Sequence, residues 1–375
     1  MSASDIDRRA FVAGMAGTAL AAWADRNQAV ASPASRDYLD EAYKKLMPYA
    51  AGALEDGGIS HAPMVAEALN TLGRGDAFNA WFDKYRRRRR PARSRSAAPF
   101  DQPHSALGRE RDPNRWSATF RAQLGGGWKA MLRRWLPVLM PGLAGGAAHG
   151  LIRTSHAVRA VKAKNSPQRV TEVADALGLW AAWYQPLPGN PGQAPKVRLP
   201  TAAIAEVPSL PLNRRGRGIG RSFRRLHEYS PFAGAIDLAA PGDNVGAFMD
   251  DLLDLGSKLY LINAEGRTIA WAHAVTAPTA AMVLAPYLDP GPLKTAAQYA
   301  WQLIAALHAS FSPARLDLDR AGARVTADRA ADLPGRAVQN GDEHVIKLVE
   351  ACLRGWRRTE NRVFLAAATD ICSRL

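Results

Sequence analysis

The chain has 375 residues, of which 47% are hydrophobic and 22% are charged. This composition is typical of a globular protein with a substantial core, and it excludes a disordered or fibrous chain. No flexible tether divides the sequence, so one large domain is expected despite the length. The two cysteines, Cys352 and Cys372, exclude a disulfide framework and a cysteine-based zinc site. We expect two free thiols rather than a single disulfide between them.

The first 31 residues predict an export signal. Arg8 and Arg9 precede an uncharged stretch rich in Gly and Ala, and Ala29 to Ala31 form a small-residue cleavage site. This order is typical of a twin-arginine signal, which engages the twin-arginine translocation machinery. A permanent membrane helix needs about 20 strongly apolar residues, so no integral membrane segment is expected in the mature chain, 32–375. The alternative is an ordinary N-terminal helix in a cytoplasmic protein.

The net charge of +15 is concentrated in two groups of arginines. Neither group interleaves aromatic residues as nucleic-acid binders usually do, and both are expected to be solvated loops. No nucleic-acid partner is therefore expected, whereas an anionic membrane surface stays possible. The first group comprises Arg86 to Arg90, Arg93 and Arg95, and the second comprises Arg214, Arg215, Arg217, Arg221, Arg224 and Arg225.

Apolar residues recur at helical spacing along most of the chain, which predicts an all-α, bundle-like domain with long loops. Pro91 to Pro113 and Pro186 to Pro211 lack periodicity and are expected to be loops. Strand-like alternation is sparse, and Leu259 to Ile262 is the best candidate. The expected helical regions are Tyr38 to Tyr49, Met64 to Leu69, Trp116 to Leu139 with a break at Gly125 to Gly127, Gly142 to Val161, Ser166 to Tyr184, Asn244 to Leu255, Ile269 to Leu288, Thr295 to Phe311 and Asp342 to Arg358.

Histidines are the residues that carry most of the chemical information. His149 and His156 are seven residues apart, which places both on one helix face two turns apart, with Arg153 between them. Their axial separation of about 10 Å means that a shared metal would lie between them, or that one histidine would only support a ligand. The metalloprotease motif HExxH is absent. Spacing alone therefore gives a weak signal for metal binding.

Several separated motifs together resemble the questin oxidase-like family. The resemblance runs from about Leu39 to Cys352 and includes the Leu72-Gly73-Arg74 turn and Leu179 to Tyr184. The motifs that carry histidines are Ser60-His61-Ala62-Pro63-Met64, the segment from His149 to His156, Trp271-Ala272-His273-Ala274-Val275-Thr276 and Asp342-Glu343-His344-Val345-Ile346-Lys347.

The resemblance implies a largely helical oxidase that opens a ring of an anthraquinone-type polyketide beside a carbonyl. A related family member is similar to a non-haem iron dioxygenase whose metal is held by four histidines and a carboxylated lysine. Carried onto this chain, the implied ligands are His61, His149, His273 and either His156 or His344, with Lys347 as the anionic oxygen donor. The implied partners are Fe(II), O2 and a small aromatic substrate.

This chemistry has a physical reason to use these residues. Imidazole suits Fe(II), and an anionic oxygen ligand balances the charge of the metal. A desolvated lysine loses its proton more readily, and its free amine can then add carbon dioxide to form a carbamate. Lys347 follows His344 by three residues, so both project from adjoining positions of one helix. Without a metal, Lys347 would extend along an apolar stripe and end in solvent.

Aromatic residues and an arginine are the candidates for substrate contact. Trp180, Trp183 and Tyr184 could form a wall for a flat substrate, although helical spacing suits core packing equally well. Arg153 could orient an enolate or phenolate between the histidines as a catalytic residue, or it could satisfy a buried carbonyl or carboxylate.

Two other functions remain open from the sequence. A nicotinamide-dependent Baeyer–Villiger monooxygenase would need a dinucleotide site, and Gly216 to Gly220 is the nearest match. That segment lacks the last glycine of GxGxxG and opens no βαβ unit, so NADPH is the less favoured cofactor. The other alternative is a periplasmic protein that only binds an aromatic ligand, with structural histidines.

The signal prediction is testable by export. Replacing Arg8 and Arg9 together with Lys should leave the protein in the cytoplasm, because the paired arginines are the feature that the translocation machinery reads. Cell fractionation with an antibody against the mature chain measures the outcome, and a mature N-terminus near Ser32 is expected for the wild type. Unchanged export of the double variant contradicts the prediction.

Overall fold

The computed structural model describes residues 37–375, with gaps at 94, 193–194, 217, 313–315 and 325–328. The predicted signal lies outside the described residues. Of the chain, 71% is helical, and only isolated β-bridges, with no strand, occur within the described part. The all-α expectation is confirmed. Buried apolar side chains of these helices form a continuous core, as expected for one large domain.

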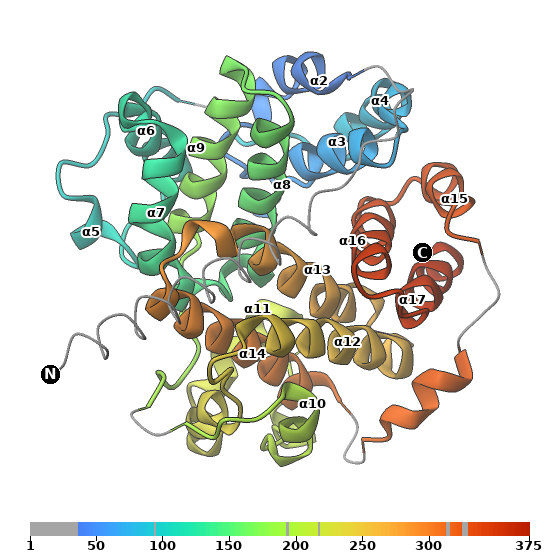
Figure 1. The fold of residues 1–375 in the computed structure, drawn as a ribbon. Helices are drawn as coiled ribbons and strands as arrows, with labels where there is room; N and C mark the ends of the chain where they lie inside the picture. The colour runs from blue at the N-terminus through green and yellow to red at the C-terminus, as the bar shows by residue number, and fades with distance from the viewer. Residues whose placement is uncertain (1–36, 94, 193–194, 217, 313–315, 325–328) are drawn as a thin grey trace, which may run out of the picture.

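The helices of the first half of the chain lie in the upper part of the view in Figure 1. They are α2 (Leu39–Lys45), α3 (Ala62–Thr71), α4 (Phe78–Arg88), α5 (Pro103–Ala106), α6 (Pro113–Ala122), α7 (Trp128–Leu139), α8 (His149–Ala163) and α9 (Pro167–Ala182). The second half contributes α10 (Pro200–Ala203), α11 (Ile219–Leu226), α12 (Val245–Asn263), α13 (Thr268–Leu284), α14 (Pro290–Phe311), α15 (Leu333–Asn340), α16 (Glu343–Thr359) and α17 (Val363–Arg374).

Local sequence signals explain most helix ends. Ser166 caps α9, where its side chain accepts a hydrogen bond from the Arg169 N–H, and Pro167 occupies the first helical position. Asp342 caps α16 in the same way by accepting from the His344 N–H. The glycines that follow Leu124 separate α6 from α7, as predicted. Each predicted helical region contains a helix, although α8 begins at His149 rather than Gly142 and α12 continues to Asn263 rather than ending at Leu255. Helices α4, α11, α15 and α17 were not predicted.

Three sequence-based expectations need correction. The segments expected as loops, Pro91 to Pro113 and Pro186 to Pro211, contain the short helices α5 and α10. Leu259 to Ile262 is not a strand but part of α12, because its apolar residues continue the helical face that packs on α13. The arginine groups are not entirely loops either. Arg86 to Arg88 form the last turn of α4, where their positive charges interact favourably with the helix dipole, and Arg221, Arg224 and Arg225 lie in α11.

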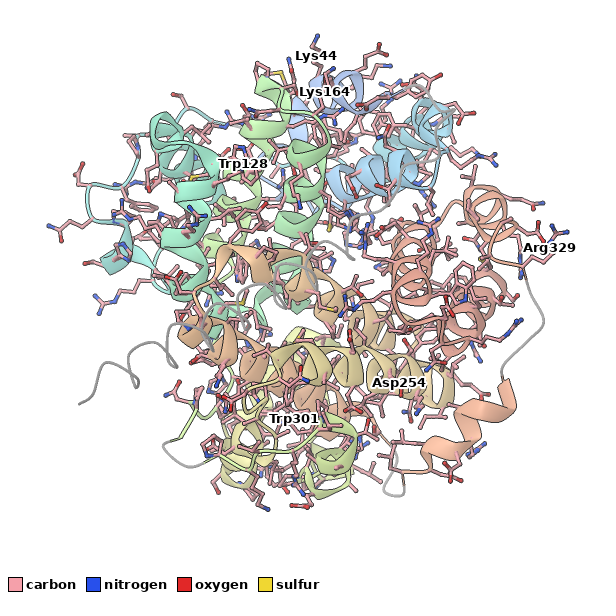
Figure 2. The ribbon with its side chains drawn as sticks, in the orientation of Figure 1. Lys44, Trp128, Lys164, Asp254, Trp301 and Arg329 are labelled. Atoms are coloured by element: carbon pink, nitrogen blue, oxygen red, sulfur yellow. The ribbon has the colours of Figure 1, made fainter. Side chains whose placement is uncertain are left out.

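Helix α13 is the central element of the fold. It packs against α8, α12, α14 and α16, and Figure 1 shows it in the middle of the molecule. By length and composition alone, Thr268–Tyr287 could cross a membrane, but most of this segment is buried inside the protein. Its apolarity is therefore explained by packing on all sides. Figure 2 shows a similar contrast, with Trp301 inside the core and Lys44 and Lys164 at the edge.

Helices α8 and α9 approach each other closely at a glycine. A Cβ atom at Gly150 would lie only 2.5 Å from the Cα of Trp180, so no larger residue fits there without a shift of one helix. This contact fixes the start of α8 against α9. The first turn of α8 carries His149, and the glycine therefore helps to set where that side chain lies.

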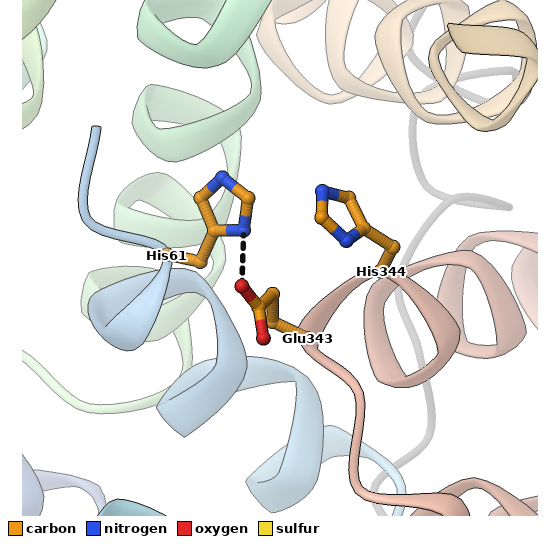
Figure 3. Close-up of side chains that lie close together, drawn as sticks. All are labelled: His61, Glu343 and His344. Carbon is orange, nitrogen blue, oxygen red and sulfur yellow. Dashed lines mark ion pairs between the residues drawn. The ribbon is translucent and has the colours of Figure 1, made fainter. Parts of the chain in front are cut away.

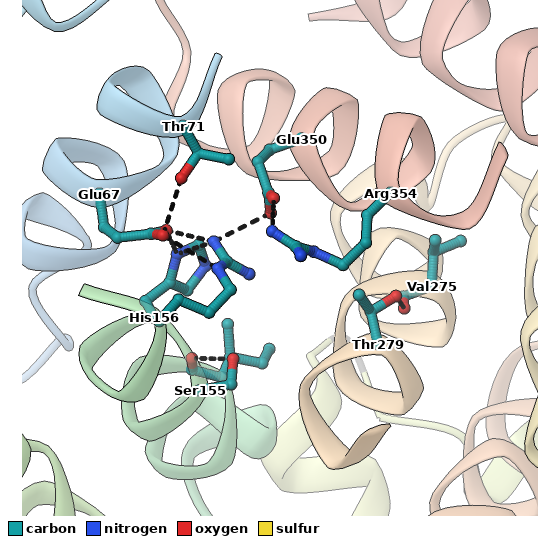
Figure 4. A network of polar contacts seen from close by, with 10 residues as sticks. Glu67, Thr71, Ser155, His156, Val275, Thr279, Glu350 and Arg354 are labelled. Atoms are coloured by element: carbon teal, nitrogen blue, oxygen red, sulfur yellow. Dashed lines mark hydrogen bonds and ion pairs between the residues drawn. The ribbon is translucent and has the colours of Figure 1, made fainter. Parts of the chain in front are cut away.

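A buried ionic cluster joins α3, α8 and α16 (Figure 4). Glu67 of α3 accepts hydrogen bonds from His156 Nδ1 at 2.6 Å and from Arg159 Nε at 2.9 Å. The Arg159 guanidinium also lies 3.1 Å from Glu350 of α16, which pairs in turn with Arg354. Burial raises the pKa of Glu67, but the charge of Arg159 and the bond with His156 outweigh it and hold that pKa below its usual value.

Removal of Arg159 tests whether this cluster holds the three helices together. Arg159→Ala should lower the free energy of unfolding by about 3–5 kcal/mol, because Glu67 and Glu350 would stay buried without their shared cation. Lys162→Ala, an exposed position on the same helix, is the control and should change it by less than about 0.5 kcal/mol. Equal effects in urea unfolding would contradict the role of the cluster.

Candidate metal centre

Four histidines from four helices meet beside one cavity. His61 is the residue before α3, His149 is the first residue of α8, His273 lies in the second turn of α13, and His344 lies in the first turn of α16. All four line a cavity of about 680 Å³. Lys347 follows His344 by one turn of α16 and is 4% exposed. The structure thus brings together four of the six metal ligands that the sequence suggested, and the charge of Lys347 acts on three of these four rings.

The imidazoles are close enough to share one ion. The Nε2 atoms of His61 and His149 are 2.8 Å apart, and the two rings are stacked with centroids 4.6 Å apart. The ring centroids of His61 and His344 are 4.7 Å apart, and those of His149 and His273 are 5.1 Å apart. Two nitrogens that bind one ion at about 2.1 Å and at right angles lie about 3 Å apart. The His61 and His149 nitrogens have this relation.

Three of the rings are held through their Nδ1 atoms. His149 Nδ1 lies 2.5 Å from the Gly146 carbonyl, His273 Nδ1 lies 2.7 Å from the Ile269 carbonyl, and His344 Nδ1 lies 3.0 Å from Asp342 Oδ1. Because each acceptor requires a proton on Nδ1, the lone pair of a neutral ring is on Nε2. Metal-binding histidines in proteins are usually oriented in this way.

The turn before α8 has an unusual backbone. Gly146, Ala147 and Ala148 have φ angles of 55°, 57° and 64°, in the left-handed region. For alanine this conformation costs roughly 1–2 kcal/mol per residue. The turn directs the Gly146 carbonyl to His149 and lets the chain enter α8 beside the cavity. Such strain is found mostly where surrounding structure and function both require it.

Glu343 lies next to the ring of His61, the one ring of the four whose Nδ1 has no acceptor described so far (Figure 3). Its Oε1 is 3.6 Å from His61 Nδ1, and that nitrogen is buried with no hydrogen-bond partner among the described residues. Ligand atoms of His61, Glu343 and His344 all lie within 4.8 Å of one another, so these three could also hold an ion. In that case His61 would bind through Nδ1 and turn Nε2 to His149. The sequence pattern did not single out Glu343 as a functional residue.

Burial lowers the pKa of four basic side chains in this cluster. Burial, followed by the charge of Lys347, lowers the pKa of His61 and of His149 well below the usual value, and it lowers that of His273 to about 3. Burial also lowers the pKa of Lys347 to about 8, although Glu343 and Asp342 act in the opposite direction. Neutral nitrogens are the form that binds metals.

Two residues that the sequence grouped with the site lie elsewhere. His156 faces the buried ionic cluster, where it binds Glu67, and does not line the cavity. Arg153 is fully buried and makes a two-pronged ion pair with Glu172 at 2.7 and 2.9 Å. Arg153 therefore satisfies a buried carboxylate, which was one of the two roles expected for it. The helix face that joins His149 to His156 turns away from the cavity within two turns.

The three candidate aromatic residues have different surroundings. Trp183, the residue after the end of α9, is half-buried and lines the cavity. Trp180 is buried in the core, and Tyr184 packs against Gly142. Core packing thus accounts for Trp180 and Tyr184, and Trp183 stays available to a ligand.

The cavity also contains residues that sequence reasoning missed. Gly218 and Gly220 come from the glycine-rich segment that was considered for a dinucleotide, and no strand precedes it in the described part of the chain. Arg224 follows in α11 and was expected only as part of a solvated arginine group. Arg111 lies in the loop expected at Pro91 to Pro113, and Phe311 ends the helix expected at Thr295 to Phe311, but neither residue was a candidate for the site. Only the three-dimensional fold brings these separate segments to one wall.

Comparison of the chain with family models, with curated proteins and with solved structures gives no match. The resemblance to the questin oxidase-like family therefore rests on the sequence motifs alone.

Acid titration of the metal-free protein tests the buried histidines. The pKa of His273 in the folded protein lies near 3, below the ordinary 6.5, so the unfolded chain binds more protons between these values. Stability should therefore fall as the pH is lowered from 6.5 towards 3, and His273→Gln should reduce this slope. Urea unfolding at several pH values measures it. The exposed His227→Gln is the control, and an unchanged slope in His273→Gln would contradict the prediction.

Proposed function

We propose that the protein is a metal-dependent oxygenase that acts on a planar aromatic compound, with Fe(II) as its metal. The observation that carries the proposal is the convergence of four imidazoles beside a cavity of about 680 Å³. Cavities of this size accommodate a substrate of several fused rings. The resemblance to the questin oxidase-like family supplies the reaction class, an oxidation that opens or inserts oxygen into a ring.

The donor set fits a metal ion better than it fits a purely structural core. Packed histidines usually pair each nitrogen with its own hydrogen-bond partner. Here the Nε2 atoms of His61 and His149 face each other, and both rings have depressed pKa values. A direct hydrogen bond between them would need one proton on Nε2 of a ring. In neutral His149 the proton is on Nδ1, where the Gly146 carbonyl accepts it, so His61 would have to be the donor through its Nε2. The Nδ1 atom of neutral His61 would then carry no proton.

The proposed ligands are His61, His149, His273 and His344 through their Nε2 atoms. In this arrangement Nδ1 of His61 carries a proton and faces Glu343. Glu343 would then orient His61 and raise its basicity, as carboxylates commonly do beside metal-bound histidines. This assignment gives every ring an acceptor on its far side. It also leaves His156 outside the ligand set, because that ring belongs to the buried ionic cluster.

Lys347 is the proposed source of the anionic ligand. Its side chain is buried, its pKa lies near 8, and it makes no hydrogen bond or ion pair in the described part of the chain. A neutral lysine amine attacks carbon dioxide, a C–N bond forms, and the nitrogen releases one proton to leave a carbamate. The product is a carboxylate-like group on a long side chain. Bound iron would supply the activation of O2, and the carbamate would balance its charge.

The chain's own residues have distinct roles in this proposal. The Gly146 and Ile269 carbonyls and Asp342 hold the rings in place, and the cavity wall with Trp183 receives the substrate ring beside the histidines. Nothing in the fold favours a nicotinamide site, so NADPH remains the lesser alternative. A protein that only binds an aromatic ligand is the non-enzymatic alternative, and its purified form would carry no stoichiometric metal.

Substitution of Lys347 tests the proposal directly. Lys347→Ala should lose iron and turnover together, because the anionic ligand is removed. In the wild type, stripping dissolved carbon dioxide at mildly acidic pH should lower activity, and bicarbonate should restore it. A small carboxylic acid should partly restore metal binding in Lys347→Gly. Iron content by elemental analysis and O2 consumption with an anthraquinone are the measurements.

Matched variants separate loss of the metal from loss of the fold. His149→Gln should abolish iron binding, whereas His156→Gln on the same helix should keep iron and lose only stability. Glu343→Gln should weaken iron binding by about 10–100-fold without abolishing it. Full iron content and wild-type turnover in Lys347→Ala would disprove the carbamate, and a metal-free but folded wild type would favour the binding protein.

A further inference from the structure

The segment after α9 runs beside the turn that leads to His149. The Gln185 backbone N–H donates to the Gly142 carbonyl at 3.2 Å. A Cβ atom at Gly145 would lie only 1.6 Å from the carbonyl oxygen of Trp183, so only glycine lets the two backbones approach this closely. Trp183 and Gln185 both line the cavity that the four histidines line. The backbone contacts therefore fix where both residues lie relative to the proposed metal ligands.

The side-chain amide of Gln185 has no hydrogen-bond partner among the described residues. Its Nε2 atom is buried and unpaired, and its Oε1 atom accepts no hydrogen bond from the described part of the chain. Thr268 is the other described residue of the cavity wall with a neutral amide or hydroxyl group, and its hydroxyl already donates to the Ala264 carbonyl at 3.0 Å. Buried polar groups nearly always have a partner, either in the protein or in water. The Gln185 amide is thus available to a molecule that enters the cavity.

Apolar side chains lie close to the same turn. A Cβ atom at Gly146 would lie 2.5 Å from Ile59 Cδ1 and 3.6 Å from Trp183 Cδ2. Both side chains are therefore next to the residue whose carbonyl orients His149, and both line the cavity. Ligand cavities are typically apolar with a few polar groups, and those polar groups fix the orientation of the ligand. An indole ring with an unpaired amide two residues further along the chain has this composition.

We infer that Gln185 determines which aromatic compounds the cavity accepts, because its amide hydrogen-bonds an oxygen substituent of the compound while Trp183 packs on the ring. The inference rests on the proposed function, since it specifies the substrate of that same site. The amide turns about its last side-chain bond, so either its N–H groups bind a ring carbonyl or its oxygen binds a ring hydroxyl. A hydrocarbon of the same shape leaves the amide unpaired and binds more weakly.

Binding of three compounds with one ring skeleton tests the inference. Fluorene, 9-fluorenone and 2-hydroxyfluorene have the same fused rings, and they carry no oxygen, a carbonyl and a hydroxyl, respectively. Equilibrium dialysis, with the free compound measured by chromatography, gives each dissociation constant. The preference for an oxygen compound is the ratio of the fluorene constant to its own constant. Comparison of this ratio between the wild type and a variant cancels the difference in hydrophobicity between the compounds.

Gln185→Met assigns the preference to the amide, because it keeps the length of the side chain and removes both hydrogen-bonding atoms. The ratio for one oxygen compound should fall about fivefold, the change expected for one hydrogen bond. A fall for fluorenone identifies a carbonyl as the recognised group, and a fall for 2-hydroxyfluorene identifies a hydroxyl. Thr268→Val is the control on the same wall and should keep both ratios, because the Thr268 hydroxyl already bonds the Ala264 carbonyl.

Three results overturn the inference. Unchanged ratios in Gln185→Met would show that another group of the cavity, such as an arginine, bonds the oxygen. Absence of binding of all three compounds to the wild type would show that the cavity accepts no such ring. If Gln185→Met does not fold, Gln185→Leu takes its place, and failure of both variants to fold would make the amide a structural group.

Metal analysis of the same samples distinguishes this inference from the proposed function. Each titration is made with the protein as purified and after iron is removed by chelation, because a contribution of the metal disappears on chelation and that of the amide persists. If the wild type contains no iron but the ratio falls in Gln185→Met, the oxygenase proposal fails and the role of Gln185 stands. If the wild type contains iron but Gln185→Met keeps both ratios, the role of Gln185 fails and the metal proposal stands.

Discussion

Five basic groups buried in one place cannot all be positively charged, and this constraint shapes the rest of the site. A charged imidazole or ammonium loses its hydration on burial, and each additional charge repels the others. His61, His149, His273 and Lys347 accordingly have depressed pKa values. Without a metal, this arrangement stores unfavourable free energy. With a cation among the lone pairs, the same arrangement becomes favourable, which is the physical basis of the proposed metal centre.

Other parts of the fold hold the histidines in position. The Gly146 carbonyl and the strained turn before α8 orient His149, and the Ile269 carbonyl orients His273 within its own helix. Further from the cavity, Glu67, Arg159 and Glu350 link α3, α8 and α16. These are three of the four helices that supply histidines. The buried ionic cluster thus fixes the relative position of the ligands without touching them.

The sequence predicted most of the long helices because they have a long apolar period, and for α9 Ser166 and Pro167 also mark the start. It failed at Leu259 to Ile262, where four apolar residues suit a strand or a buried helix equally and only the packing of α12 on α13 decides. Family resemblance, rather than spacing, brought His61, His273 and Lys347 into the ligand set.

The choice between His156 and His344 could not be made from the sequence. Helical geometry places His156 and His149 on one face, but it does not say that Glu67 occupies the space at His156. The sequence could not identify the arginines that line the cavity for a similar reason. Arg111, Arg224 and Arg267 lie on three separate segments, and no local pattern distinguishes them from the other arginines of this basic chain.

X-ray absorption at the iron edge of the purified protein tests the central claim most directly, because it counts the atoms around the metal. The account predicts one iron per chain, a first shell of nitrogen and oxygen, and the outer-shell scattering of four imidazole rings. In Lys347→Met the imidazole signal of any residual iron should persist while the oxygen contribution falls. A protein that binds no iron, or iron with fewer than two imidazoles, would contradict the account.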